Sequence, residues 1–355
     1  MSQFSTTTAN QLWGFTHYLQ NIGIDVKGYL QKHQLPLLLL DNPQMKISTR
    51  LVYLFIDDVA IQENLPLLGW HVGQQIGWQA LENVSLKAAQ EPTLYEAFKA
   101  IINFTSMGAS HADFFLVEEE DFFEFCHVGG VALETPGYFH IESYLIAVLV
   151  DLVRSITTHN NFSPEYIKLR STPQELSIKN DKTSCLFQQG YTAISIPNSF
   201  KMAPCRKPAR VKNNIIAKQI IPDFSNLDTF KRYPGLTTLS TLLVPYLLEG
   251  TPTLQLIADI GQFSVRSLQR HLSQQGCHFN QLVQELRIDI AKCLLADKEQ
   301  SIANIAQTLQ YQQTTHFIRA FKKQTATTPK QFQKSQLQNK KIAHRIAEEV
   351  AEESS

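Results

Sequence analysis

The stretch that decides the fold of this 355-residue chain is TPTLQLIADIGQFSVRSLQRHLSQQ, which occupies residues 251–275. The segment Thr251-Pro252-Thr253 opens a helix, and the apolar residues that follow it recur at helical spacing. Gly261 interrupts this first helix, and Ser264 can cap a second one. Two short helices joined by a glycine-containing turn predict a helix-turn-helix unit over about residues 253–275.

A similar pattern recurs about 47 residues further along, which predicts a second helix-turn-helix unit over about residues 301–324. Ala258 and Ala306 occupy equivalent places, where two helices cross and a larger side chain would force them apart. Leu268 and Phe317 correspond as apolar residues of the second helix in each unit. An ordinary helical bundle is the alternative, but the tandem match of small and apolar positions favours two related units.

The first half of the chain mixes helical and strand patterns. Apolar residues at helical spacing predict helices at about residues 8–32, 48–63, 93–106 and 138–156. Strand patterns at residues 113–118 and 122–128 predict an antiparallel hairpin, and residues 166–170 and 193–197 predict two further strands. This mixed order predicts an α+β domain.

The formal net charge of zero conceals an uneven distribution along the chain. Residues 1–199 hold 11 Lys and Arg against 20 Asp and Glu, residues 200–235 hold 8 against 2, and residues 236–337 hold 10 against 6. An acidic first half joined to a basic second half is expected when one module binds an anion and the other does not. Chance segregation of surface charge is the alternative.

Composition divides the chain into four parts. A basic, proline-interrupted linker at residues 201–235 separates an α+β domain for sensing or dimerisation, residues 1–200, from an all-α domain, residues 236–337. Residues 338–355 form a C-terminal tail. In the all-α domain, the helical pattern of residues 279–296 predicts one long helix that joins the two helix-turn-helix units.

Several classes of protein are disfavoured by what the sequence lacks. No apolar stretch approaches the roughly 20 residues of a membrane-spanning helix, and the first residues do not resemble a signal peptide, so we expect a cytoplasmic protein. The five cysteines lack CxxC spacing, which favours reduced thiols over disulfides or a zinc site. Nucleotide-binding, hydrolase and metalloprotease motifs are absent too. We therefore expect no enzyme activity, no cofactor and no metal.

From about residue 236 to residue 336 the sequence resembles the paired helix-turn-helix domain of AraC/XylS-type transcriptional regulators. The first half more weakly resembles the arabinose-binding-like α+β sensor domain of one branch of that family, through residues 91–94, 162–164 and 194–197. The residues that carry the first resemblance cover both units and the helix between them: SVRSLQR at 264–270, Gly276, Phe279, Leu286, Arg287, Ala291, Leu294, Leu295, SIANIA at 301–306, HFIRAFK at 316–322, Thr328 and Pro329.

Two residues depart from the family pattern. The family usually has glycine where this chain has Gln310, and again where it has Ala326. A side chain on left-handed backbone costs on the order of 1 kcal/mol relative to glycine. If either residue is left-handed, the turns of the second unit differ locally from those of the family.

The resemblance implies that the second helix of each unit enters the major groove of DNA, with the two helices about one turn, ~34 Å, apart. Arg can bind the guanine edge and Gln the adenine edge. Phosphate contacts or solvated side chains are the alternative for each residue. The implied DNA-binding residues are Ser264, Arg266, Ser267, Gln269 and Arg270 in the first unit, and Thr314, Thr315 and Arg319 in the second.

The family pattern also implies that the first half controls the second, by binding a small molecule, by dimerising, or both. An aromatic cluster that includes Phe114, Phe123 and Phe125 is a candidate effector pocket, and plain core packing is the alternative. The implied partners are double-stranded DNA, an unidentified small-molecule effector, a second copy of the chain and RNA polymerase. Both activation and repression stay open.

Two rival functions are weighed against regulation. An architectural DNA-binding protein would need no effector and would coat DNA broadly. A DNA repair protein that accepts alkyl groups would use Cys205, because the sequence Pro204-Cys205-Arg206 resembles the nucleophile motif of alkyltransferases. That motif has a histidine that activates the thiol, and this chain lacks it.

Overall fold

The computed structural model divides the chain into two compact units. The larger unit is Ser5–Lys218, and the smaller unit is Gln219–Ser355 together with Met1–Phe4. The boundary between them falls inside the predicted linker. The structure describes residues 4–108, 112–129, 131–172, 183–207, 222–224, 226–296, 300–336 and 338, so most of the predicted tail lies outside the described residues.

The larger unit contains a five-stranded sheet in the order β3-β4-β7-β5-β6. Neighbouring strands are antiparallel except β5 and β6, which are parallel, and a separate two-stranded sheet pairs β1 with β2. The strands are β1 Thr6–Thr8, β2 Lys46–Ser48, β3 Ala112–Glu118, β4 Phe122–Gly129, β5 Tyr166–Lys168, β6 Ser184–Leu186 and β7 Thr192–Pro197.

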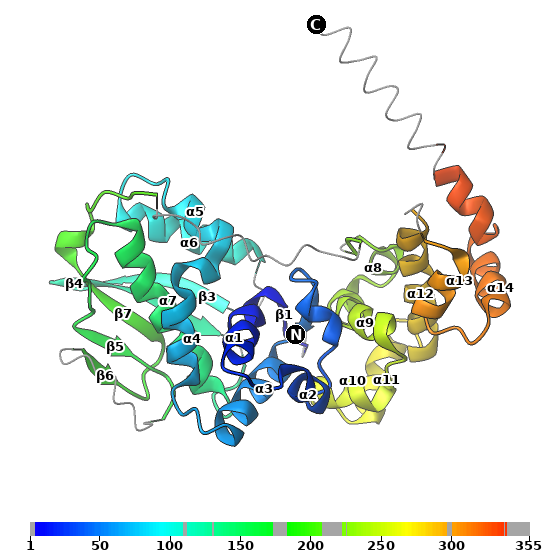
Figure 1. The fold of residues 1–355 in the computed structure, drawn as a ribbon, viewed down its shortest axis with the longest axis horizontal. Helices are drawn as coiled ribbons and strands as arrows, with labels where there is room; N and C mark the ends of the chain where they lie inside the picture. Colours follow the sequence, from blue (N-terminus) through cyan, green and yellow to red (C-terminus); the bar gives the residue numbers. More distant parts are fainter. Residues whose placement is uncertain are drawn as a thin grey trace, which may run out of the picture. The chain divides into compact units, whose positions relative to one another are not determined.

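Helices pack against this sheet: α6 contacts β3, α7 contacts β7, and α4 packs against α7 (Figure 1). The α-helices of the unit are α1 Asn10–Asn21, α2 Val26–Lys32, α3 Thr49–Gln62, α4 Leu68–Ile76, α5 Glu82–Ala88, α6 Leu94–Gly108 and α7 Tyr138–Ile156. Short 3-10 helices occupy Leu37–Leu40, Gly77–Leu81 and Asn198–Phe200. The α+β prediction for the first half is confirmed.

The main core of the larger unit lies between the sheet and helices α6 and α7. Phe123 and Phe125 on β4 are fully buried there, and the Phe125 ring lies 4.5 Å from the ring of Phe98 on α6. Phe114 on β3 packs against the same core and is only partly buried. Two of the three residues predicted to line an effector pocket, Phe123 and Phe125, therefore lie within the core. Core packing was the alternative interpretation of this aromatic cluster.

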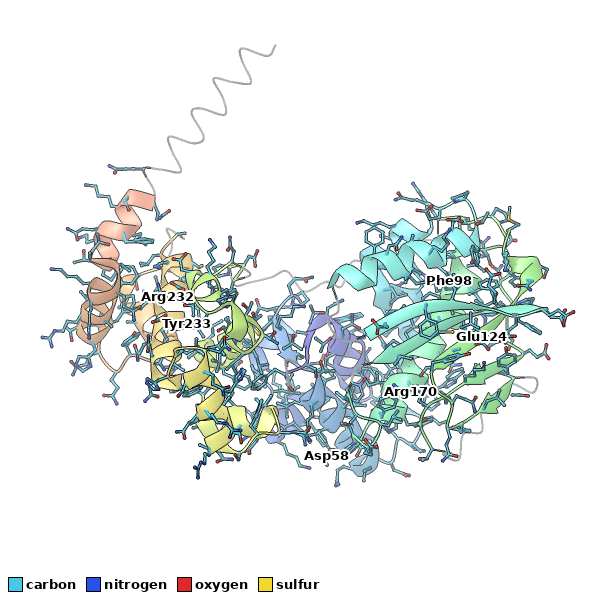
Figure 2. All side chains as sticks on the ribbon, turned by 180° about the vertical axis from the view of Figure 1, so that it is seen from behind. Asp58, Phe98, Glu124, Arg170, Arg232 and Tyr233 are labelled. Atoms are coloured by element: carbon cyan, nitrogen blue, oxygen red, sulfur yellow. The ribbon has the colours of Figure 1, made fainter. Side chains whose placement is uncertain are left out.

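The opposite face of the sheet carries a buried charge. Glu124 on β4 is fully buried, and its carboxylate lies 2.7 Å from the Lys168 ammonium (Figure 2). The hydroxyls of Tyr166 and Tyr191 donate to the same carboxylate at 2.7 and 2.9 Å. A buried carboxylate is tolerated when it is paired and hydrogen-bonded in this way.

The smaller unit is helical over its described residues, which confirms the predicted all-α domain. A 3-10 helix at Pro234–Leu236 lies between α8 and α9, and Phe279–Leu295 is the long helix predicted between the two helix-turn-helix units. The α-helices are α8 Asp228–Arg232, α9 Thr237–Glu249, α10 Leu254–Ile260, α11 Val265–Gln274, α12 Phe279–Leu295, α13 Ile302–Thr308 and α14 Thr314–Thr325.

Residues at both ends of the predicted linker pack against the neighbouring compact unit. On the N-terminal side, the Ala203 carbonyl accepts the Leu94 N–H at 2.9 Å, and the Arg206 N–H donates to the Ile156 carbonyl at 2.7 Å. On the C-terminal side, α8 packs against α12. Residues 208–221 and 225 lie outside the described residues, and within the described part no helix is long and apolar enough to span a membrane.

Helix α8 is held to α12 by charged groups. The Arg232 guanidinium pairs with Glu285, whose carboxylate also accepts the Tyr233 hydroxyl at 3.2 Å (Figure 2). Asp289 accepts both the N–H and the hydroxyl of Thr229, at 2.7 and 2.6 Å. These bonds fix the segment before α9 on the helix that joins the two helix-turn-helix units.

Candidate nucleic-acid interface

The two helix-turn-helix units begin with the same capping bond. The Thr253 hydroxyl accepts the Leu256 N–H at 3.1 Å, and the Ser301 hydroxyl accepts the Asn304 N–H at 3.1 Å. Each cap satisfies a backbone N–H that has no partner within its own helix. The sequence prediction that Thr251-Pro252-Thr253 opens the first helix is confirmed, and the structure makes Thr253 its N-cap.

Buried alanines hold the first and second helices of each unit close together. The Ala258 carbonyl accepts the N–H of Phe263 at 2.9 Å, and the Ala306 carbonyl accepts the N–H of Tyr311 at 2.9 Å. Both alanines are buried, in keeping with their expected place at the helix crossing. A larger side chain at either position would have to displace the neighbouring helix.

The two turns share a left-handed residue, and in both it is glutamine. Gln262 has φ 56° and Gln310 has φ 62°, whereas Gly261 has the ordinary value of −86°. Ala326, which follows α14, is left-handed as well, with φ 60°. Both non-glycine departures predicted for the second unit therefore carry the strain of about 1 kcal/mol expected on left-handed backbone. The first unit carries it too, at a residue that the sequence did not single out.

Helix α11 has a buried face and an exposed face. Leu268 and Leu272 are buried against the rest of the unit. Arg266, Gln269 and Arg270 are exposed, and their spacing places them on one side of the helix. The three side chains are therefore free to contact a ligand that approaches this helix.

Ser264 and Ser267 are bonded to each other at the start of α11. The Ser264 hydroxyl accepts the Ser267 N–H at 3.1 Å, and the two hydroxyls lie 2.9 Å apart. Ser264 is the N-cap of the helix. Because these hydroxyls already have partners, their first role is to fix the N-terminus of α11, and a phosphate contact would be additional.

Helix α14 repeats this arrangement with different side chains. Phe317 and Phe321 are buried, Thr315 and Arg319 are exposed, and Thr314 is partly buried. The preceding residue, Gln313, makes no side-chain capping bond, but its amide oxygen accepts the Thr315 hydroxyl at 3.3 Å. Among the predicted contact residues, α14 therefore exposes one hydroxyl and one guanidinium, whereas α11 exposes two guanidiniums and an amide.

Cations on both helices have no acidic partner among the described residues. Within the residues that the structure describes, no carboxylate lies within 4.0 Å of Arg266, Arg270 or Arg319. Lys322 and Lys323 at the end of α14 are exposed and likewise unpaired within that part of the chain. Unpaired cations on the exposed faces of two helices suit a polyanion such as DNA.

Arg287 on α12 contacts residues of both helix-turn-helix units. Its Nη2 donates to the Thr251 hydroxyl, just before α10, at 2.6 Å, and its guanidinium lies 5.8 Å from the centre of the Tyr311 ring in the second turn. The side chain is buried, and burial lowers its pKa. The sequence marked Arg287 only as a residue of the family pattern, because its two partners lie far away along the chain.

Cys205 does not have the environment of a reactive thiol. Burial, together with the nearby charge of Glu91, raises the pKa of the Cys205 thiol to about 11. A nucleophilic cysteine needs the opposite shift, because the thiolate is the attacking form. In the described part of the chain, no group of three or more His, Cys, Asp or Glu side chains is arranged to hold a metal ion.

Two known families match separate parts of the chain. Residues 257–335 match the family described as "Helix-turn-helix domain", and residues 23–180 match "Arabinose-binding domain of AraC transcription regulator, N-term". The first match begins within α10 and covers the rest of both helix-turn-helix units together with α12. The second covers most of the larger unit.

Known transcription regulators resemble parts of the chain. The chain is 34% identical over 80 residues to the "HTH-type transcriptional activator CfaD" and 35% identical over 80 residues to the "Transcriptional activator AggR", both of Escherichia coli. Each match covers 22% of this chain and 30% of the relative, so the chain aligns with less than a third of their length. The solved structure of the transcriptional regulator CdpR from Pseudomonas aeruginosa aligns with 90% of this chain and 98% of its own, at 14% identity and a TM-score of 0.37.

The matches agree with the geometry of both units. A paired helix-turn-helix domain follows an α+β domain. The first matches a helix-turn-helix family, and the second matches the N-terminal domain of AraC transcription regulators. The chain is similar to AraC-type transcriptional regulators in both parts of its sequence.

Proposed function

We propose that this protein is a transcription regulator that binds defined sites in double-stranded DNA through α11 and α14, under the control of a small molecule bound by its larger unit. The observation that carries the proposal is the pair of helix-turn-helix units. Each exposes hydrogen-bonding side chains on its second helix, and no carboxylate of the described residues lies within 4.0 Å of the guanidiniums on these two helices. Arg266 and Gln269 are the side chains that we assign to base edges.

We assign a different role to each of the two domains. The α+β domain, residues 1–200, senses the effector or dimerises, and residues 236–337 bind DNA. Ser264, Ser267, Thr314 and Thr315 fix helix ends and contact phosphate, whereas Arg266, Gln269, Arg270 and Arg319 reach into the groove. A second copy of the chain and RNA polymerase are the further partners proposed for a regulator of this family.

Selection of bound duplexes from a random DNA library tests the proposal. The full-length protein should enrich a motif of two short elements whose centres are about one helical turn apart. A library that returns no shared motif, with the protein folded and bound to DNA, would support the architectural alternative instead. Mass spectrometry of Cys205 after incubation with methylated DNA decides the repair alternative, and we expect no added methyl group.

Salt dependence separates phosphate contacts from base contacts. Lys322→Ala should weaken binding uniformly across sequences and reduce the slope of log K against log salt by about 1 if Lys322 meets one phosphate. Lys99→Ala is the matched control, because Lys99 is an exposed lysine of the larger unit that pairs with Glu96 at 3.1 Å. That control should leave the slope unchanged.

A further inference from the structure

The larger unit contains a cavity of about 850 Å³, within the size range of small-molecule sites. Its walls come from α3 and the residues after it, from the first turn of α7 with the loop before it, and from the loops after β5 and β6. These segments are far apart in the sequence. The loop after β5 contributes Arg170, which Figure 2 labels in this unit.

Arg170 is a cation without an acidic partner among the described residues. Its Nη1 donates to the Tyr138 hydroxyl at 2.9 Å, and the guanidinium lies 5.9 Å from the centre of the Tyr138 ring. Its Nε is buried and has no hydrogen-bond partner within the described part of the chain. A guanidinium keeps its charge at any physiological pH, so an incompletely paired, partly buried one favours an anionic ligand.

The nearest buried carboxylate is already occupied. Glu142 on α7 accepts the N–H of Arg170 at 2.6 Å, the N–H of Ser171 at 3.1 Å and the hydroxyl of Thr192. These bonds fix the backbone of the loop after β5 at the cavity wall. They use the carboxylate to hold the loop, so the Arg170 side chain is left for another partner.

Two further polar groups of the wall are unpartnered. His140 Nδ1 and Ser171 Oγ are buried without a hydrogen-bond partner among the described residues. Burial lowers the pKa of His140 to about 4, so its ring is neutral at pH 7 and can donate one hydrogen bond and accept another. Buried polar groups without partners are costly, and a polar ligand would supply the missing bonds.

The cavity also has acidic groups, which restricts the ligand further. Asp57 on α3 and the exposed Glu134 line it, and the Asp57 carboxylate accepts the Gly137 N–H. A ligand with two carboxylates or a phosphate would be repelled by this pair. A ligand with one carboxylate could place it on Arg170, and its hydroxyl or amino groups could donate to Asp57 and Glu134.

We propose that this cavity binds a small carboxylic acid that also carries hydroxyl or amino groups, with its carboxylate on Arg170 and its donors toward Asp57 and Glu134. The proposal rests on the proposed function, in which the larger unit senses an effector. It replaces the phenylalanine cluster as the effector site, because Phe123 and Phe125 fill the core and do not line this cavity.

Thermal melting of the full-length protein with paired probes tests the proposal. The probes are L-glutamine, L-lysine, L-serine, L-lactate and D-gluconate, each beside the primary amide of its carboxylate, with L-arabinose and decanoate as a neutral sugar and an apolar acid. At least one of the five acids should raise the melting temperature while its amide does not. Stabilisation by L-arabinose or decanoate alone, or by none of the probes, would overturn the proposal.

Variants locate the site. Arg170→Gln should weaken binding of the active acid about tenfold or more, the usual loss for a hydrogen bond to a charged group. Arg206→Gln removes an exposed arginine of the same unit and should leave binding unchanged. Equal binding by Arg170→Gln and wild type would contradict the assignment. If Arg170→Gln is unfolded, calorimetry of the wild type with the acid and its amide decides the carboxylate preference alone.

DNA binding by the same proteins separates this proposal from the proposed function. Arg170→Gln should bind the selected DNA motif as the wild type does without ligand, but the acid should no longer change that binding. A wild type that binds the acid and no DNA motif would refute the regulator proposal and leave the ligand site standing. A wild type that binds the motif and none of the acids would do the reverse.

Discussion

The two helix-turn-helix units have the same backbone arrangement but expose different side chains. Both have a hydroxyl cap, a buried alanine and a left-handed glutamine, and the hydrogen bonds of their turns correspond. The second helix of the first unit is capped by Ser264 and exposes Arg266, Gln269 and Arg270. The second helix of the other unit has no side-chain cap, and its predicted contacts are mainly hydroxyls.

This difference shows that the backbone and the chemistry of recognition are separable. Burial and hydrogen bonds place α11 and α14 in the same way, while the exposed residues decide what each helix can contact. Guanidinium and amide groups form bidentate bonds with base edges, whereas a hydroxyl bonds with many partners. We therefore expect the first unit to supply most of the sequence discrimination and the second to supply more of the positioning.

Core truncation should have the largest effect. Phe317→Ala empties a buried site on α14 and should lower the free energy of unfolding by about 3–5 kcal/mol, and Leu268→Ala on α11 by about 2–5 kcal/mol. Urea titration followed by circular dichroism measures both. If the second unit alone unfolds in Phe317→Ala, the two units are less coupled through α12 than their contacts indicate.

Removal of base contacts should come next. Arg266→Ala should weaken binding to the selected motif by about 1–3 kcal/mol, roughly 5- to 150-fold, because a bidentate contact is lost. Arg319→Ala makes the same change in the second unit. Equal losses measured by fluorescence anisotropy for the two variants would contradict an unequal division between the units.

Helix caps should have an effect of about 1 kcal/mol. Ser264→Ala removes the cap of α11 and should lower the free energy of unfolding by about that amount, whereas Gln313→Ser gives α14 a cap and should raise it. Thermal melting measures both. If Gln313→Ser does not raise the free energy of unfolding, the hydrogen bond between Gln313 and Thr315 already stabilises the start of α14 as much as a cap would.

The smallest effect should come from the left-handed turn residues. Gln262→Gly and Gln310→Gly relieve backbone strain and should each raise the free energy of unfolding by about 0.5–1 kcal/mol. Gln269→Gly is the control, because it places glycine inside α11 and should destabilise by about the same amount. Destabilisation by either turn variant would contradict the strain assigned to that turn.

Much of the fold follows from local patterns in the sequence. The helix predicted at residues 138–156 is α7, residue for residue, and the hairpin predicted at residues 113–118 and 122–128 is β3 with β4. Helix α8 was not predicted, because Pro222, Pro234 and the basic residues around them indicate a linker. Its stability comes from Glu285 and Asp289, and no local pattern reveals partners so distant along the chain.

The sites were predicted unevenly for the same reason. The residues of α11 and α14 lie on single helices, so spacing alone separates Arg266 and Arg319 from the buried Leu268 and Phe317. The left-handed residue of the first turn was missed because the neighbouring Gly261 is the more obvious helix breaker. The cavity of the larger unit was missed because its walls come from separate segments, and alternating phenylalanines cannot distinguish a pocket from a core.

The central claim is that both second helices bind DNA and that the first unit discriminates among sequences more strongly. Parallel selections from one random library, with wild type, Arg266→Ala and Arg319→Ala, test it most directly. We predict a motif of two elements for the wild type, loss of a conserved base in one element for Arg266→Ala, and a smaller change in the other element for Arg319→Ala. Identical motifs for all three proteins, or no motif for the wild type, would contradict the claim.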